Sequence, residues 1–280
     1  MIEDSGRWFL RTMARQGRIA IGKSQREVGI NVDRSKDTIL DWEKGTTDIP
    51  PSSIDALAEA CGLSKETGGY MKEVARARKA GVPIEADMRF NAIFLALAEA
   101  NAGYIFKADA LLIPGPLQTR DYYYLVVSRT EPGATQEWLD GGWVYKDARA
   151  EMLEQRMKFA VRPRAHFLIG EAALLHILRI SKELYQAVMA HLRRWARKPG
   201  VSIRILREPV PPRNGNFSIY TEGNIPLSCP PTVYTEIADS SWLINDPERI
   251  ASYDGIRKLL WNLAIRIEDY QDDDWRYHLA

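Results

Sequence analysis

Residues 24–45, SQREVGINVDRSKDTILDWEKG, decide the fold of the N-terminal part of the chain. Ser24 and Ser35 each precede a run typical of a short helix, and serine is a favoured N-cap residue. Asp33 and Arg34 lie between the two runs and are predicted to form a turn. Gly45 stands where the end of a helix needs a residue that tolerates a positive φ. The stretch therefore predicts two short helices joined by a tight turn.

Apolar residues in this stretch indicate which helix faces are buried. Val28 and Val32 are four positions apart, so they share one face of the first helix. Ile39 and Trp42 give the second helix its core face, which leaves short polar side chains at the start of that helix exposed. Such side chains are what reading a major groove requires. An ordinary surface hairpin of helices is the alternative, and the agreement of caps, apolar spacing and turn disfavours it.

The stretch resembles the phage-repressor class of helix-turn-helix domains, the XRE family. An early Gln, an Ile in the recognition helix and a closing Glu-x-Gly fall on Gln25, Ile39 and residues 43–45. Gly29 replaces the usual Ala, and we expect it to weaken its helix by about 1 kcal/mol. Asp33 replaces the usual Gly, and Asp tolerates a left-handed conformation better than most residues. The resemblance implies a DNA-binding domain.

Side chains on and beside the second helix are the predicted DNA contacts. Lys36 suits a guanine edge or a phosphate, Asp37 a cytosine amino group and Thr38 a thymine methyl group. Gln25 would bind a phosphate or anchor the recognition helix, and flanking basic residues would clamp phosphates. The full predicted set is Gln25, Arg34, Ser35, Lys36, Asp37, Thr38, Asp41, Lys44, Arg15 and Arg18.

Arginines upstream of the motif strengthen this interpretation. Residues 7–26 include Arg7, Arg11, Arg15 and Arg18 and no acidic residue. Their spacing of three or four positions places them near one helix face. A formal net charge of +1 gives no global argument for nucleic acid, so the local distribution of charge matters. A solvated basic face is the alternative, but beside a helix-turn-helix we favour phosphate contact.

The rest of the chain divides into further helices, a linker and a second domain. Residues 53–62 predict a helix with Ile54, Leu57 and Cys61 on its core face, and residues 65–79 predict another. Gly and Pro then interrupt the helical pattern. We therefore predict a helix-turn-helix domain at residues 1–80, a linker at 81–84 and a second domain at 85–280.

The second domain mixes predicted strands and helices. Strands are predicted at residues 103–107, 165–170, 201–206, 216–220 and 232–237, and helices at 85–102, 146–160, 183–198 and 247–267. The last helix is expected to bury Ile250, Ile256, Leu259, Leu260 and Leu263. The predicted fold is an N-terminal all-α, phage-repressor-like domain followed by a C-terminal α+β domain, whose single mixed sheet is covered by helices. The strand order is left open.

From residue 85 the order of elements is similar to a domain of actinobacterial regulators, the WhiJ-like or Scr1-type antitoxin-like family. IPGPLQTRDYY at 113–123, the helix at 149–155 and FLIGEAAL at 167–174 carry this resemblance. Pro116 and Gly170 depart from the usual Leu and Asp. The resemblance implies that the domain binds a small protein encoded nearby, or an effector, in an antitoxin-like arrangement.

No residue pattern indicates catalysis. The chain contains no GxSxG, P-loop or GxGxxG motif. Its four histidines and two cysteines lack the spacing of metal ligands, so we expect no enzyme, cofactor or metal site and interpret each histidine as structural. Glu171 ends a predicted buried strand, and we expect an ion pair with Arg149 or Arg156 there rather than a catalytic acid.

Aromatic residues suggest a place for the second domain's ligand. Large side chains usually fill cores, and the chain has eight tryptophans. An apolar pocket for a partner or effector is a second interpretation. The acidic end at residues 268–274 is interpreted as a solvated tail, with a basic partner or the DNA-binding face as alternative contacts. The residues predicted to line the pocket are Tyr122, Tyr123, Trp138, Trp143 and Trp242.

These observations predict a sequence-specific transcriptional regulator that binds double-stranded DNA as a homodimer, because one small helix-turn-helix makes too few contacts. A small protein encoded nearby is a further possible partner. No apolar run has the length of a membrane span and the N-terminus is not a signal peptide, so we expect a cytoplasmic, nucleoid-associated protein. The alternative is a protein-interaction module that no longer reads DNA, because Asp33, Asp37 and Asp41 would repel phosphates.

Overall fold

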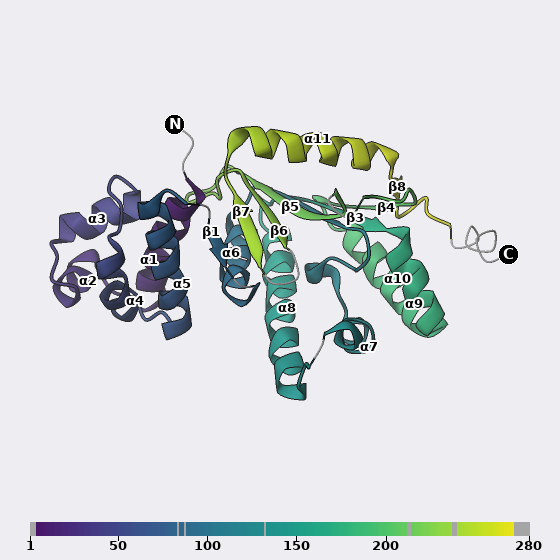
Figure 1. Ribbon diagram of the computed structural model, residues 1–280, viewed down its shortest axis with the longest axis horizontal. Helices are drawn as coiled ribbons and strands as arrows, with labels where there is room; N and C mark the ends of the chain where they lie inside the picture. Colours follow the sequence, from purple (N-terminus) through teal and green to yellow (C-terminus); the bar gives the residue numbers. More distant parts are fainter. Residues whose placement is uncertain are drawn as a thin grey trace. The chain divides into compact units, whose positions relative to one another are not determined.

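The computed structural model describes residues 4–82, 84–86, 88–131, 133–211, 214–236 and 240–271 (Figure 1). The chain forms two compact units. The first comprises Met1–Ala102 and Tyr220–Ile250, and the second comprises Gly103–Ile219 and Ala251–Ala280. Each unit is therefore built from two separate segments of the sequence.

The N-terminal part of the first unit is helical, as predicted. Ile39 and Trp42 are 1% and 4% exposed, which confirms the core face of the second motif helix. Ile54, Leu57 and Cys61 are also buried, as expected. The helices are α1 (Ser5–Ala20), α2 (Gln25–Asn31), α3 (Lys36–Lys44), η1 (Pro51–Ser53), α4 (Ile54–Ala60) and α5 (Lys65–Ala80).

Segments from beyond residue 80 complete the first unit. They are β1 (Ile84–Ala86), α6 (Met88–Asn101), β6 (Thr232–Glu236) and β7 (Ser241–Ile244). Both β1 and β6 pair antiparallel with β7. Phe9 of α1 stacks on Phe94 of α6 with ring centroids 5.5 Å apart. The predicted division at 81–84 stays a prediction, and Pro83 lies outside the described residues. The packing adds that α1–α5 share a compact unit with the start of the following region.

Parallel strands form the centre of the second unit. β2 (Tyr104–Asp109), β3 (Arg164–Gly170) and β4 (Val201–Leu206) pair in parallel, and β8 (Ile265–Arg266) adds to β4 in the antiparallel sense. With β5 (Asn216–Thr221), the strands that the structure describes follow the order β1-β7-β6-β5-β2-β3-β4-β8 in one mixed sheet. The predicted single mixed sheet is confirmed. The short strands β1, β7 and β8 were not predicted.

Helices cover both faces of the β2-β3-β4 sheet. α11 runs along one face, while α9 and α10 lie on the other (Figure 1). Trp261 of α11 stacks on His166 of β3 with ring centroids 4.6 Å apart. The remaining helical elements of the chain that the structure describes are η2 (Gly115–Leu117), α7 (Arg120–Leu125), η3 (Val127–Thr130), α8 (Gln136–Met157), α9 (Glu171–Ile180), α10 (Lys182–Ala196) and α11 (Pro247–Leu263). None of the helices in the described ranges is long and apolar enough to cross a membrane.

The predicted core face of α11 is wrong in part. Leu260 is buried, but Leu259 and Leu263 are 60% and 52% exposed. The sheet beneath α11 presents polar and aromatic side chains, and these are met by Trp261 and Arg257 instead of aliphatic residues. The spacing of the aliphatic residues alone therefore predicted the wrong face of α11 as the buried one, because part of that face points away from the sheet.

Candidate nucleic-acid interface

The first helix of the motif begins and ends through local contacts. Ser24 and Glu27 form a capping box, in which the Ser24 Oγ accepts from the Glu27 backbone N–H and the Glu27 carboxylate accepts from the Ser24 N–H. The turn after α2 places Asp33 at φ 53°. The backbone N–H of Arg34 then donates to the carbonyl of Gly29 at 2.8 Å. Asp33 thus takes the left-handed role that Gly usually plays at a helix C-terminus.

Gly29 is required by this turn. A Cβ atom at Gly29 would lie 2.7 Å from the carbonyl oxygen of Arg34, which is a backbone atom and cannot rotate away. The propensity cost expected of Gly29 stays a prediction, and the structure adds an opposing effect, because the Cβ of an Ala at this position would collide with the turn. Gly29 and Asp33 both depart from the XRE pattern. The backbone of Arg34 passes so close to position 29 that it explains the glycine there.

The recognition helix α3 presents its N-terminal end to solvent. Arg34, Ser35, Lys36 and Asp37 are exposed and Thr38 is half-buried. The Ser35 hydroxyl accepts from the Thr38 N–H at 3.1 Å and lies 3.0 Å from the Thr38 hydroxyl, so both hydroxyls serve the cap. Lys36 and Asp37 make no hydrogen bond or ion pair with any residue that the structure describes. They are therefore the side chains best placed to contact bases.

The two ends of α3 also carry the remaining predicted contacts. Arg34 donates from Nη1 to the carbonyl of Asp33 at 2.7 Å, which leaves most of its guanidinium donors outward. Asp41 is half-buried and Lys44 is exposed. Gly45 ends the helix with φ 74°, as predicted. A cation at each end of the exposed face suits phosphates on both sides of the groove.

Gln25 anchors the recognition helix, which is one of the two roles expected of it. Its Nε2 donates to the Oε2 of Glu43 in α3 at 2.8 Å. Glu43 is 4% exposed and was not among the predicted site residues. The only signal for it in the sequence is the Glu of the Glu-x-Gly pattern. The contact fixes the start of α2 against α3.

Arg18 is also engaged inside the domain. Its Nε and Nη2 donate to the two carboxylate oxygens of Glu43 at 2.5 and 2.9 Å, and its Nη1 donates to the carbonyl of Lys23 at 2.8 Å. The hydrogen bond to Glu43 raises the pKa of Arg18 against the lowering effect of burial. This geometry argues for a structural role of Arg18 rather than the predicted phosphate contact. Arg15 is half-buried and, among the described residues, has no hydrogen-bond or ion-pair partner.

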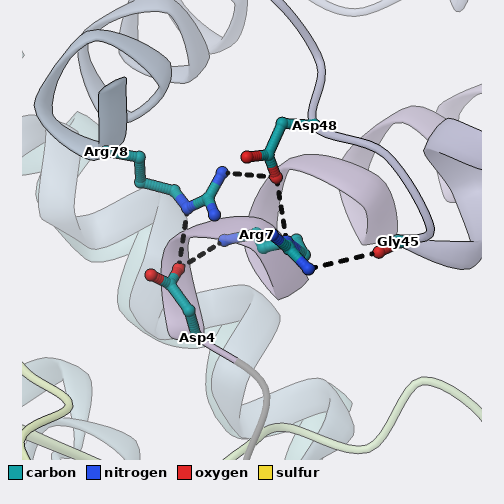
Figure 2. A network of polar contacts seen from close by, with 5 residues as sticks. All are labelled: Asp4, Arg7, Gly45, Asp48 and Arg78. Carbon is teal, nitrogen blue, oxygen red and sulfur yellow. Dashed lines mark hydrogen bonds and ion pairs between the residues drawn. The ribbon is translucent and has the colours of Figure 1, made fainter. Parts of the chain in front are cut away.

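A second polar network joins α1, α5 and the segment after α3 (Figure 2). Asp48 accepts from Arg7 Nε at 2.9 Å and from Arg78 Nη1 at 3.0 Å. Asp4 caps α1 by accepting from the Arg7 N–H, and it also accepts from Arg78 Nε, both at 2.8 Å. Arg7 Nη1 reaches the carbonyl of Gly45 at 3.4 Å. The C-terminal end of the recognition helix is thereby tied to the first turn of α1.

Charge in this network favours ionised carboxylates. Burial acts to raise the pKa of Asp48, but its hydrogen bond and charge contact with Arg78 and the charge of Arg7 hold that pKa below its ordinary value. Arg7 and Arg18 therefore form ion pairs with residues far along the chain, Asp48 and Glu43 respectively. Part of the basic face predicted from residues 7–26 therefore forms ion pairs within the domain.

The aromatic residues predicted for a partner or effector pocket are divided between the two compact units. Tyr122 is buried and its hydroxyl accepts from the Ile113 N–H at 3.0 Å. Tyr123 is also buried and packs against Trp143, with ring centroids 5.9 Å apart. Trp138 is 53% exposed. Trp242 lies in β7 of the first unit, opposite Thr235 and Glu85. Among the four that lie in the second unit, the rings of Tyr123 and Trp143 pack against each other.

Glu171 has an ion-pair partner, but it is neither of the two arginines that the sequence predicted. Glu171 pairs with Arg207 at 3.3 Å and accepts from the Tyr270 hydroxyl at 3.1 Å, so the expected ion pair exists with a different arginine. Burial and the charges of nearby arginines, first Arg164, lower the pKa of His166 to about 4. Among the described residues, no group of three or more His, Cys, Asp or Glu side chains is placed to hold a metal ion.

Comparison with known proteins divides the chain into two matched regions. The family described as "Helix-turn-helix domain" matches residues 8–67, which run from α1 into α5. This match supports a DNA-binding regulator. The family described as "Domain of unknown function (DUF5753)" matches residues 94–269. No curated protein matches the chain. The narrower XRE and WhiJ-like or Scr1-type assignments stay predictions. Since its match covers more than half of the sequence, the chain belongs to the DUF5753 family.

Proposed function

We propose that the protein is a sequence-specific transcriptional regulator, which binds DNA as a homodimer and responds to a small protein or effector bound by its DUF5753 region. The observation that carries this proposal is the exposed N-terminal end of α3. Lys36 and Asp37 project there from a capped helix whose other side is anchored by Glu43. A rigid helix with unengaged polar side chains at its start is suited to reading base edges in the major groove.

Phosphate contacts would come from cations around this helix. Arg34 and Lys44 flank its exposed face, and Arg26 of α2 and Arg15 of α1 add exposed or half-buried positive charge. Such contacts position a protein on DNA and make its affinity salt-dependent. One domain supplies few base-reading side chains, so a second copy is needed for tight specific binding. A regulator of this kind would work in the cytoplasm, at the nucleoid.

A second candidate function rests on the carboxylates of the same surface. Asp33 and Asp37 are exposed and Asp41 is half-buried, and among described residues none of the three side chains has a salt-bridge partner. Carboxylates near a phosphate backbone oppose binding, whereas a basic protein surface would attract them. On this hypothesis the helix-turn-helix is a protein-interaction module. Neither candidate function requires a catalytic step.

Selection of DNA by the full-length protein separates these candidates. The purified chain would be incubated with a library of random duplexes at low salt, and the retained sequences would be enriched over several rounds. We expect one enriched sequence with two related half-sites, bound more tightly than random duplexes at every salt concentration, with affinity that falls steeply as salt rises. Failure to retain any duplex at low salt would contradict the regulator and favour the interaction module.

The role of the DUF5753 region needs a separate measurement. The product of a small open reading frame beside the gene would be purified and titrated into the regulator bound to its selected duplex. Release or tightening of the duplex is the expected result, because a ligand with different affinity for the free and bound states must shift the equilibrium. Unchanged DNA affinity at saturation would contradict a regulatory role for that protein.

A further inference from the structure

Trp8 of α1 joins the helix-turn-helix domain to the DUF5753 region within the first compact unit. Its side chain is completely buried. The ring packs edge-to-face on Phe94, with centroids 5.7 Å apart, and its Nε1–H donates to the carbonyl of Leu227 at 2.8 Å. Phe94 and Leu227 both lie inside the match to DUF5753, whereas Trp8 begins the match to the helix-turn-helix domain. One side chain therefore bonds across the two matched regions.

The acceptor belongs to a turn with an unusual backbone. Leu227 has φ 62°, a left-handed conformation that residues other than glycine rarely adopt. The turn is fastened next to this position, because the Cys229 N–H donates to the Asn101 carbonyl at 3.0 Å and the Gly223 N–H donates to the Ser228 hydroxyl at 2.6 Å. A disfavoured conformation persists only where its surroundings hold it. These contacts hold the Leu227 carbonyl against Trp8 in this structure.

The residue before Trp8 reaches the recognition helix. Successive residues of a helix point about 100° apart. Arg7 accordingly points elsewhere, where it bonds Asp48 and the carbonyl of Gly45 at the C-terminal end of α3 (Figure 2). A single turn of α1 therefore contacts both the Leu227 turn and the end of the recognition helix. Displacement of this first turn of α1 would move both contacts together, because a helix shifts as a rigid element.

We propose that Trp8 is a positioning residue for DNA recognition, through which the DUF5753 region sets the orientation of α3. The proposal rests on the DNA-binding function proposed above, and it adds the physical link between the two regions. A ligand-induced shift of the Leu227 turn acts on α1 through the Trp8 hydrogen bond and the Phe94 contact. Arg7 passes that shift to Gly45 and Asp48. The base contacts of α3, and with them DNA specificity, then change, while the number of phosphate contacts, which sets the salt slope, stays the same.

Substitution Trp8→Phe in the full-length protein tests the link, because Phe keeps an aromatic ring against Phe94 and removes the N–H donor. Loss of one hydrogen bond corresponds to a change of about three- to ten-fold in an equilibrium constant. We expect affinity for the selected duplex to fall by about this factor, with affinity for random duplexes and the salt slope unchanged. Trp195→Phe is the matched control, because Trp195 is a buried tryptophan of α10 in the second unit.

Hydrogen exchange in the DNA-free protein gives a readout that is independent of DNA binding. The backbone N–H groups of Gly45 and Thr46 donate to Trp42 and Asp41 and close the end of α3. We expect these two amides to exchange several-fold faster in Trp8→Phe than in Trp195→Phe or the unaltered protein. Unchanged exchange at Gly45 and Thr46 would overturn the proposal, even if the unaltered protein selects DNA as proposed.

A double substitution completes the test. Asp48→Asn weakens the Arg7 end of the link, and Trp8→Phe removes the Leu227 end. If both act through the same turn of α1, their combined effect on the selected duplex is smaller than the product of the single effects. Equal loss of affinity on selected and random duplexes by folded Trp8→Phe protein would also overturn the proposal, because Trp8 would then support DNA binding in general and not the orientation of α3. Failure of the unaltered chain to bind any duplex contradicts the proposed function alone.

Discussion

Arg18 and Glu43 form a bidentate ion pair that joins α1 to the recognition helix α3. The Arg18 side chain is 14% exposed and that of Glu43 is 5% exposed. Gln25 donates to the same carboxylate from the start of α2. One acidic side chain therefore holds α1 and the two helices of the motif together. This pair holds α3 in place behind the proposed DNA-reading surface instead of forming part of that surface.

Arg18→Ala is expected to destabilise the protein strongly. Removing one partner of a buried ion pair leaves the other charge uncompensated, which costs about 3–5 kcal/mol. Urea denaturation would measure this loss in the free energy of unfolding. Arg15→Ala is the control: Arg15 has no hydrogen-bond or ion-pair partner within the described ranges, and we expect a change within about 0.5 kcal/mol. On DNA, Arg15→Ala should reduce the salt slope by about 1. A stable Arg18→Ala protein with a flatter salt slope would contradict the structural role.

Gly29→Ala and Gly69→Ala should change stability in opposite directions. A Cβ at Gly29 would lie 2.7 Å from a backbone oxygen, so overpacking is expected to cost about 1–3 kcal/mol. A Cβ at Gly69 in α5 meets nothing within 4 Å, so the better helix propensity of Ala should stabilise by about 0.5–1 kcal/mol. Urea denaturation of both variants measures the difference. Stabilisation by Gly29→Ala would show that the turn relaxes around the added methyl group.

Local signals explain why the helix-turn-helix was predicted closely. Ser24, Ser35 and Gly45 act on residues no more than a few positions away, so caps and helix ends can be read from the sequence. Gly29 could not be explained from such local signals, because the need for a glycine there comes from the backbone of Arg34, which returns close to it. Helix propensity alone assigns such a glycine a cost and no benefit.

Partners across the sheet could not be predicted for a related reason. Glu171 follows β3, and the parallel register places Gly170 opposite Leu206. The residue after Leu206 is Arg207, which pairs with Glu171. Without a strand order, no rule of spacing selects this arginine over Arg149 or Arg156. The exposed leucines of α11 have the same origin, since the polar sheet face under that helix is also set by strand order.

His166 should make stability depend on pH. The pKa of His166 falls from its ordinary value of 6.5 to about 4 in the fold, first because of burial. Between these values the unfolded chain binds a proton that the folded chain does not, so the free energy of unfolding decreases as pH falls from about 6.5 to about 4. His166→Phe keeps a ring to stack on Trp261 and removes this titration.

Urea denaturation at a series of pH values would measure the effect. We expect the free energy of unfolding to fall less with acidification in His166→Phe than in the unaltered protein. His191 keeps part of the dependence, because burial also lowers its pKa to about 4. His176→Gln is the control, since His176 is exposed on α9. The same pH dependence in His166→Phe and the unaltered protein would contradict the prediction.

Lys36→Ala should change which sequence is read. Lys36 is exposed at the start of α3, beside the Ser35 cap. Loss of a base contact is expected to lower affinity for the selected duplex by about 1–3 kcal/mol and to relax one base position, measured with single-base variants of that duplex. Lys44→Ala is the matched control at the other end of the helix, and it should weaken selected and random duplexes alike. Equal weakening of both by Lys36→Ala would assign Lys36 to a phosphate instead of a base.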